Sequence, residues 1–177
     1  MNGFRAPWVF SLAVLASACA SVQLAPVQAD AAAKKFDAPP PGHANLYVYR
    51  NENFGGAVRM NVNLDGVVLG DTGAKTYLYT PIPEGVHTIV SKAENDSTSV
   101  IDARAGSSYF VWQEVKMGIW SARSALQQVE EQKGRAAVLQ CKLAKTNRPG
   151  GCAKDIDCKG NRICEAGACV EPPPRTN

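Results

Sequence analysis

A stretch of strict alternation constrains the fold of this chain most. Residues 58–65 have the sequence Val-Arg-Met-Asn-Val-Asn-Leu-Asp, in which apolar and polar side chains alternate. A period of two places all the apolar side chains on one face of a β-strand. The dipeptide Asp65-Gly66 favours a tight hairpin turn into a second strand over 67–69. The sequence therefore predicts antiparallel strands with one buried face.

The same composition recurs along the middle of the chain. Short segments rich in Val, Ile, Thr and Tyr are separated by turn residues such as Pro83-Glu84-Gly85. A last strand over 126–131 and a short helix over 134–143 follow, with Cys141 as a small buried side chain of that helix. About 100 residues of this kind can bury a core, and they predict a mainly β fold, an antiparallel β-sandwich over 43–147. The other predicted strands are 46–50, 76–80, 86–92, 97–103 and 108–116.

The N-terminus predicts export from the cytoplasm. Arg5 supplies a positive charge, and residues 8–18 form an apolar run interrupted only by Ser11 and Ser17. This is the pattern of a signal peptide, which we place at 1–18. The run has about half of the length that a membrane-spanning helix needs, and no later segment of the sequence is long and apolar enough to cross a bilayer.

Two cleavage sites compete after this signal. Leu15-Ala16-Ser17-Ala18-Cys19 resembles the bacterial lipobox, which implies an acylated Cys19 and a membrane partner reached through the N-terminal lipid. Ala20 after the cysteine is compatible with an outer-membrane location. The alternative is cleavage after Val27-Gln28-Ala29, which would release a soluble periplasmic protein beginning at Asp30.

Composition predicts a tether after the signal peptide and argues against a nucleic-acid partner. Residues 19–42 are rich in Ala and Pro and lack a hydrophobic period, so we expect a disordered tether, with a helix over 29–36 as the alternative. The chain has 19 basic and 16 acidic residues, a net charge of +3. It shows no basic stripe with interleaved aromatic residues, so no nucleic-acid partner is expected.

The sequence lacks the motifs of common enzymes. It contains no Gly-x-Ser-x-Gly elbow, HExxH, phosphate loop or dinucleotide fingerprint. His87 is expected to be a hydrogen-bonded structural residue and His43 a solvated surface residue. We therefore predict no enzyme, no cofactor and no resident metal. A calcium site among turn carboxylates is the alternative, and these are Asp65, Asp71, Asp96 and Asp102.

An aromatic group could form an interaction patch. Strict alternation puts Tyr109 and Val111 on one side of their strand and Phe110 and Trp112 on the other. The pattern does not tell which side is buried. If it is the side of Tyr109, then Phe110 and Trp112, together with Trp120, form a candidate patch for a protein or glycan partner.

Four segments resemble a known family. Residues 46–50, 64–66, 83–88 and 113–118 are similar to bacterial envelope lipoproteins catalogued as domain of unknown function 2846. The Pro-Glu-Gly turn followed by His and Thr is also similar to the PEGA domain, a small surface β-sandwich. The resemblance implies an immunoglobulin-like or PEGA-like fold and an envelope location. It implies no activity.

The tail forms a separate module over 148–171, before a disordered end at 172–177. Cys152, Cys158, Cys164 and Cys169 lack the paired spacing of a zinc ribbon. In an exported chain they predict two disulfides, for which three pairings exist. The segment resembles the Dickkopf N-terminal cysteine-rich region, which implies that Cys152 pairs with Cys164 and Cys158 with Cys169.

Three functions are compatible with these features. The first is a non-enzymatic, lipid-anchored envelope protein that binds or scaffolds a protein or glycan partner. The second is a soluble periplasmic binding protein cleaved after Ala29. The third is a hydrolase whose site arises only on folding, which would need His87 beside a carboxylate and a hydroxyl in a pocket.

Overall fold

The computed structural model of the chain describes residues 22–53, 58–117, 122–147, 163–165, 168–170 and 172. The predicted signal peptide, Cys19 and the pairing of the tail cysteines lie outside the described residues.

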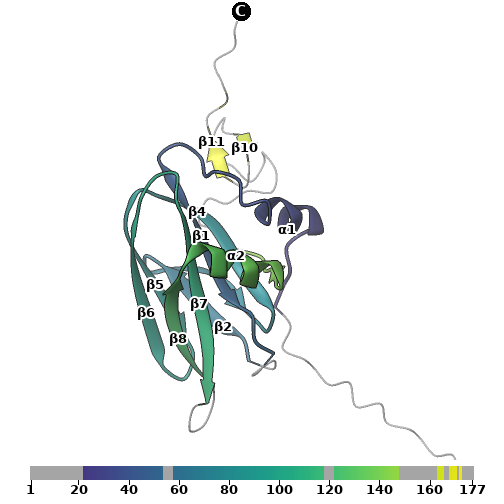
Figure 1. The fold of residues 1–177 in the computed structure, drawn as a ribbon, viewed down its shortest axis with the longest axis vertical. Helices are drawn as coiled ribbons and strands as arrows, with labels where there is room; N and C mark the ends of the chain where they lie inside the picture. The colour runs from purple at the N-terminus through teal and green to yellow at the C-terminus, as the bar shows by residue number, and fades with distance from the viewer. Residues whose placement is uncertain are drawn as a thin grey trace, which may run out of the picture.

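Two β-sheets pack face to face (Figure 1), which confirms the predicted mainly β sandwich. The five-stranded sheet has the order β8 (Ala122–Val129), β7 (Ser108–Met117), β1 (His43–Arg50), β4 (Thr76–Pro83) and β9 (Lys142–Leu143). The four-stranded sheet has the order β3 (Val67–Thr72), β2 (Met60–Leu64), β5 (Gly85–Lys92) and β6 (Asp96–Ala103). In the tail, β10 (Ile163–Glu165) and β11 (Ala168–Val170) form a separate antiparallel pair.

Most neighbouring strands are antiparallel, but two pairs are parallel. β1 pairs with β7 in parallel, with Tyr47 opposite Phe110, and β4 pairs with β9 in parallel. Local alternation carries no information about strand direction, so these pairs were not foreseen. The predicted hairpin is present between β2 and β3. Asp65 and Gly66 have φ angles of 51° and 79°, and positive values at both positions are typical of a type I′ turn.

The main core lies between the two sheets. Each strand contributes alternate apolar side chains to it, because successive side chains point to opposite faces. Polar residues also cross this interface. The Gln113 amide accepts a short hydrogen bond from Thr72 and donates one to Ser91 at 2.5 Å, so β7 is tied to β3 and β5. The buried apolar residues are Ala44, Leu46, Val48, Val62, Leu69, Leu78, Ile82, Ile89, Ile101, Ala103, Val111 and Ala144.

A second core covers the outer face of the five-stranded sheet. Two helices lie over this face (Figure 1), α1 (Val27–Ala33) and α2 (Glu131–Leu139). Gly134 brings α2 close to the sheet, since a Cβ atom there would lie 2.2 Å from Phe110 Cγ. The buried members of this core are Ala33, Tyr47, Tyr49, Tyr77, Phe110, Ala137, Val138, Cys141 and Leu143.

Side chains connect the two sheets at one edge of the sandwich. The Asn95 amide on the β5–β6 turn donates to the Ser124 carbonyl and accepts from its N–H, at 3.1 and 3.0 Å. Ser97 Oγ accepts from the Leu126 N–H at 2.9 Å. These bonds satisfy backbone groups of β8 that an edge strand would otherwise leave unpaired.

The predicted disordered tether over 19–42 is wrong for its described part. Residues 27–33 form α1, which is close to the helix weighed as the alternative for 29–36. The tether was expected because the segment is rich in Ala and Pro and has no hydrophobic period of its own. It is held instead by residues far along the chain. The predicted C-terminal helix begins and ends earlier than expected, because residues 142–143 pair with β4.

Candidate functional site

The N-terminal segment is built into the edge of the five-stranded sheet. Residues 22–25 run antiparallel to the segment that contains β9, with a bridge between Leu24 and Ala144. The Ala25 N–H donates to the Leu143 carbonyl at 2.9 Å, and the Lys145 N–H donates to the Gln23 carbonyl at 2.8 Å. Residues 22–25 therefore extend the sheet by one strand, which we call the N-terminal strand.

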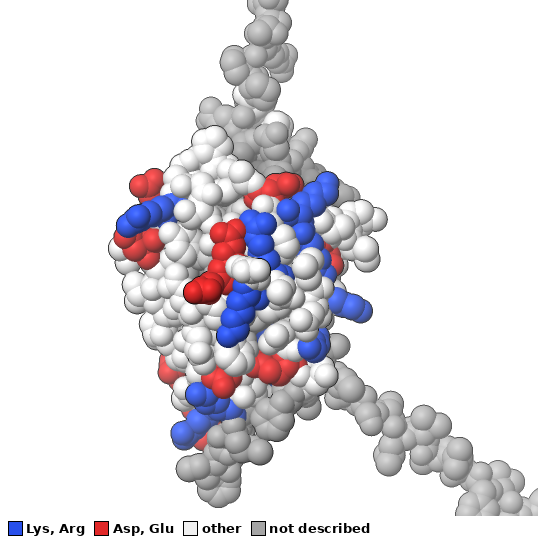
Figure 2. Space-filling model, in the orientation of Figure 1, with Lys and Arg blue, Asp and Glu red and all other residues white. Residues whose placement is uncertain are grey.

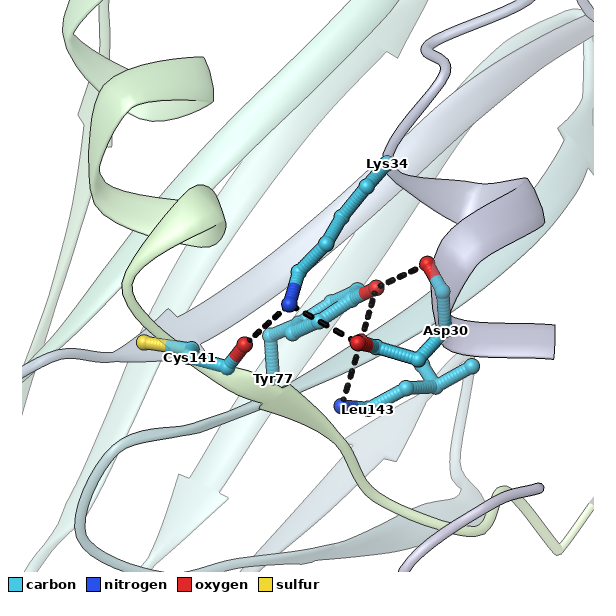
Figure 3. Close-up of polar contacts among 5 residues, drawn as sticks. All are labelled: Asp30, Lys34, Tyr77, Cys141 and Leu143. Atoms are coloured by element: carbon cyan, nitrogen blue, oxygen red, sulfur yellow. Dashed lines mark hydrogen bonds and ion pairs between the residues drawn. The ribbon is translucent and has the colours of Figure 1, made fainter. Parts of the chain in front are cut away.

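A cluster of polar contacts fastens α1 to the sheet next to this strand (Figure 3). We call Asp30, Lys34, Tyr77, Cys141 and Leu143 the N-terminal latch. The Asp30 carboxylate accepts from the Tyr77 hydroxyl at 2.9 Å and from the Leu143 N–H at 2.9 Å. Lys34 Nζ donates to Asp30 Oδ2 at 2.8 Å and to the Cys141 carbonyl at 2.6 Å. One carboxylate thus joins α1, β4 and β9.

The electrostatics of the latch favour a charged Asp30. Desolvation is the largest single influence and raises the pKa of Asp30, but the hydrogen bonds from Lys34, Tyr77 and Leu143 and the charge of Lys34 together lower it. Burial, followed by the hydrogen bond to Asp30, raises the pKa of the Tyr77 hydroxyl. Tyr77 therefore stays a donor and Asp30 an acceptor over a wide pH range.

Beside the latch lie a buried tyrosine that holds the end of α1 and a buried cysteine. Tyr47 donates to the Ala33 carbonyl at the end of α1 at 3.0 Å, and its ring stacks on Phe110 with centroids 4.8 Å apart. Cys141 is buried as predicted, but it lies just after α2 and not on it, and desolvation raises the pKa of its thiol to about 11. A thiol with that pKa is protonated at neutral pH and is a poor nucleophile.

His87 bridges two turns at the end of the four-stranded sheet. Its Nδ1 lies 2.6 Å from Asp65 Oδ2, and its Nε2 lies 2.8 Å from the Pro83 carbonyl. Desolvation, the largest influence, lowers the pKa of His87, but the bonds to Asp65 and Pro83 and the charge of Asp65 together raise it. Both ring nitrogens face acceptors, so the ring has no nitrogen free to act as a base. This arrangement agrees with the structural role predicted for His87.

The predicted aromatic interaction patch is wrong at its centre. Phe110 is fully buried beneath α2, because helices cover this face of β7 while the opposite face meets the other sheet. Trp112 is half-buried, and its Nε1 donates to Glu52 at 2.8 Å with Lys133 Nζ 6.0 Å from its ring centroid. Trp120 lies outside the described residues.

The turn carboxylates weighed as a calcium site have separate surroundings. Asp65 contacts His87, Asp71 accepts from Asn61 at 3.0 Å, and Asp96 pairs with Lys92 at 3.1 Å. Among the residues that the structure describes, no group of three or more acidic, histidine or cysteine side chains is arranged to hold a metal ion. No helix within those residues is long and apolar enough to cross a membrane.

Sequence reasoning missed the N-terminal latch entirely. Asp30 appeared only as the residue after a possible cleavage site, and Lys34 only as a charge in the tether. Their partners Tyr77 and Cys141 lie 47 and 107 residues away from Asp30 and Lys34 in the chain. The only local signal was the helix weighed for 29–36.

These features define a class of protein, a β-sandwich domain with one sheet covered by helices and an N-terminal segment built into the sheet edge. Residues 40–125 match the family described as "Protein of unknown function (DUF2846)". An uncharacterized protein of Haemophilus influenzae is 31% identical over 137 residues, which are 77% of this chain and 82% of that relative. The chain belongs to this family. Of the five latch residues only Tyr77 lies in the matched range, since Asp30 and Lys34 precede residue 40 and the other two follow residue 125.

Proposed function

We propose that this protein is a non-enzymatic envelope lipoprotein, anchored through Cys19, whose β-sandwich binds or scaffolds a protein or glycan partner. Ala20, rather than Asp, follows the acylated cysteine, which favours the outer membrane over the inner membrane. Two acyl chains on the cysteine thioether and a third on its amino group would give stable anchoring without a transmembrane helix.

The observation that carries this proposal is the integration of residues 22–34 into the fold. Cleavage after Ala29 would remove the N-terminal strand and the first turn of α1, and with them the bonds of Gln23 and Ala25 to the segment around β9. Cleavage before Cys19 would leave all of these contacts in place. The structure therefore supports processing at Cys19 over the soluble alternative.

The outer face of the four-stranded sheet supports a binding role. The described helices lie over the other sheet, and this face presents exposed apolar side chains on three strands. Val86 on β5 is 70% exposed and Val100 on β6 is 59% exposed, and each sits opposite a polar residue of the neighbouring strand. Val86 lies opposite Asp102 and Val100 opposite Thr88, so this face offers apolar and polar groups side by side to a partner.

Acylation is tested by intact-mass analysis of the mature protein and by membrane fractionation. We expect a mass that corresponds to a chain beginning at an acylated Cys19, and loss of the Cys19→Ser variant from the membrane fraction. The matched control is Ala29→Lys. Ala29 is exposed on α1, and lysine there would block a cleavage site that needs a small residue. This control should be processed and anchored like the wild type.

The opposite pattern would reject the proposal. A mature chain that begins at Asp30 without a modification, together with an unprocessed Ala29→Lys variant, would identify a soluble periplasmic protein.

Partner binding is tested by photo-crosslinking in intact cells. A photoreactive residue at Val86 or Val100 should capture a defined envelope protein or glycan. The same residue at Leu139, which is 57% exposed on α2, serves as the control on the other side of the sandwich. Equal capture from all three positions, or capture from Leu139 alone, would reject the assigned surface.

A further inference from the structure

The distance between the proposed lipid and the fold is short. Val22 is already packed against the main core, and a Cβ atom added at Gly73 would lie 3.5 Å from its side-chain methyl groups. Cys19 and Val22 are three residues apart, and an extended chain spans at most about 3.6 Å per residue. The edge of the sandwich at Val22 must then lie within about 11 Å of an acylated Cys19. The domain has no long tether that would let it turn freely.

The same edge carries unpaired basic side chains. Lys142 and Lys145 are exposed on the segment that pairs with the N-terminal strand, and the Lys75 carbonyl accepts from the Lys142 N–H at 2.9 Å. Asp30, the acidic residue of the latch, is already paired with Lys34 at 2.8 Å. Among the described residues, Lys75, Lys142 and Lys145 form no ion pair. Figure 2 shows basic side chains along the margin of the molecule on the side where α1 lies in Figure 1.

Exposed apolar side chains accompany these lysines. Leu24 on the N-terminal strand is 49% exposed, and Val27 at the start of α1 is 78% exposed. Apolar side chains beside basic ones are typical of surfaces that lie in the headgroup region of a membrane. The lysines can approach lipid phosphates while the apolar groups leave water.

We propose that this edge, made of Leu24, Val27, Lys75, Lys142 and Lys145, faces the membrane and binds the anionic headgroups of the bilayer that holds the lipid anchor. This inference rests on the proposed anchoring at Cys19. It goes further by assigning a fixed orientation to the domain, in which the β3 and β9 side of the sandwich meets the bilayer. The β6 and β8 side is then directed away from the membrane.

The orientation is tested by lysine acetylation of the full mature protein. The acylated protein is placed in vesicles of phosphatidylethanolamine and phosphatidylglycerol, and labelling of each lysine is followed by mass spectrometry. The Cys19→Ser protein, free in solution, gives the reference rates. We expect Lys75, Lys142 and Lys145 to be labelled more slowly in the vesicles. Lys92 on β5 and Lys116 on β7 are separated from this edge by intervening strands, and Lys133 on α2 lies over Trp112 of β7. These three lysines should keep their reference rates.

Two further comparisons distinguish binding of anionic headgroups from mere closeness to the bilayer. One changes the charge of the lipid, and the other uses two triple variants that each remove three lysines. In vesicles of phosphatidylcholine alone, or at about 1 M salt where the Debye length is about 3 Å, the protection should fall. In anionic vesicles, hydrogen exchange of the backbone over 142–147 should slow for the wild type and for K92A/K116A/K133A. It should not slow for K75A/K142A/K145A, which removes the same number of charges.

Each outcome decides the proposal. An acylated protein with equal labelling in vesicles and in solution would overturn the orientation and leave the anchoring intact. Protection of Lys92, Lys116 and Lys133 alone would place another side on the bilayer. Equal protection in anionic and zwitterionic vesicles would overturn the recognition of anionic headgroups. A mature protein without acyl chains would overturn both this inference and the proposed anchoring.

Discussion

At the residue scale, His87 gives the sandwich a pH-dependent contact. Its ring joins the turn at Asp65 to the turn at Pro83, and both contacts need hydrogen on the ring nitrogens. The pKa of His87 is raised above its ordinary value of 6.5. A raised pKa in the folded state means that folding favours the protonated ring. The contact therefore stabilises the fold fully below pH 6.5, and this stabilisation is lost as the pH rises through the higher folded pKa.

We predict that the free energy of unfolding falls by about 1 kcal/mol on the alkaline side of this transition. The figure is small because the Asp65 side chain is 46% exposed and solvent screens the pair. Urea denaturation of the wild type and of Asp65→Asn across neutral and alkaline pH measures the effect. The variant should lose the dependence, while His43→Gln should retain it. A wild-type free energy of unfolding that does not change over this pH range would contradict the predicted pH dependence.

Asp30 predicts a second pH dependence, with the opposite sign. Its folded pKa is lowered from the ordinary 3.8, so its contribution is present above that value and is lost as the pH falls through the folded pKa. Replacement by alanine removes three hydrogen bonds to a mostly buried carboxylate. We expect Asp30→Ala to cost about 3 kcal/mol at neutral pH.

The control for Asp30 is a carboxylate on the same segment. Asp37 is exposed, so Asp37→Ala should change the free energy of unfolding by less than about 0.5 kcal/mol. As the pH falls through the folded pKa of Asp30, the difference in stability between the wild type and Asp30→Ala should become smaller. An Asp30→Ala protein as stable as Asp37→Ala at neutral pH would show that the latch contributes nothing to folding.

At the element scale, α2 depends on the absence of a side chain at Gly134. In most helices a glycine-to-alanine change stabilises the fold by up to about 1 kcal/mol. Here the added Cβ would lie 2.2 Å from Phe110 Cγ, so the helix must move away from the sheet. We predict that Gly134→Ala destabilises the protein by about 1 to 3 kcal/mol.

Thermal unfolding measures this effect, with Gln132→Ala as the control. Gln132 is exposed on the same helix, and alanine there should be neutral or slightly stabilising. A Gly134→Ala variant with a raised melting temperature would mean that intrinsic helix propensity outweighs the contact with Phe110.

The elements also show how far the sequence could predict this fold. Alternation located the strands well, because it depends only on neighbouring residues. Asp65-Gly66 predicted the hairpin correctly, because a two-residue turn also depends only on local sequence. Phe110 shows where this reasoning fails. Both faces of β7 are covered, one by the second sheet and one by α2, so no alternation could identify an exposed side. The helix α1 was weighed only as the alternative to a tether, because the contacts that hold it come from Tyr77 and Leu143, which are distant in the chain.

At the scale of the whole molecule, the N-terminal strand determines whether the backbone groups at the β9 edge of the five-stranded sheet are paired. The backbone of residues 144–147 bonds to β4 through the Tyr77 carbonyl and to β3 through the Leu69 carbonyl, at 2.8 and 2.7 Å. The N-terminal strand then covers the outer side of this segment. Without it, the backbone groups of residues 143 and 145 that it pairs with would be exposed to solvent at an edge.

A comparison of two truncated proteins tests this role without any lipid. We predict that a chain beginning at Asp30 has a free energy of unfolding about 3 kcal/mol lower than one beginning at Ala20, since it loses two backbone hydrogen bonds, the packing of Val22 and the first turn of α1. Urea denaturation measures the difference. A chain beginning at Val22 is the control and should match the longer protein, because residues 20 and 21 lie before the N-terminal strand. If the chain beginning at Asp30 were as stable as the others, the segment would be a dispensable tether, and the structural argument for processing at Cys19 would fail with it.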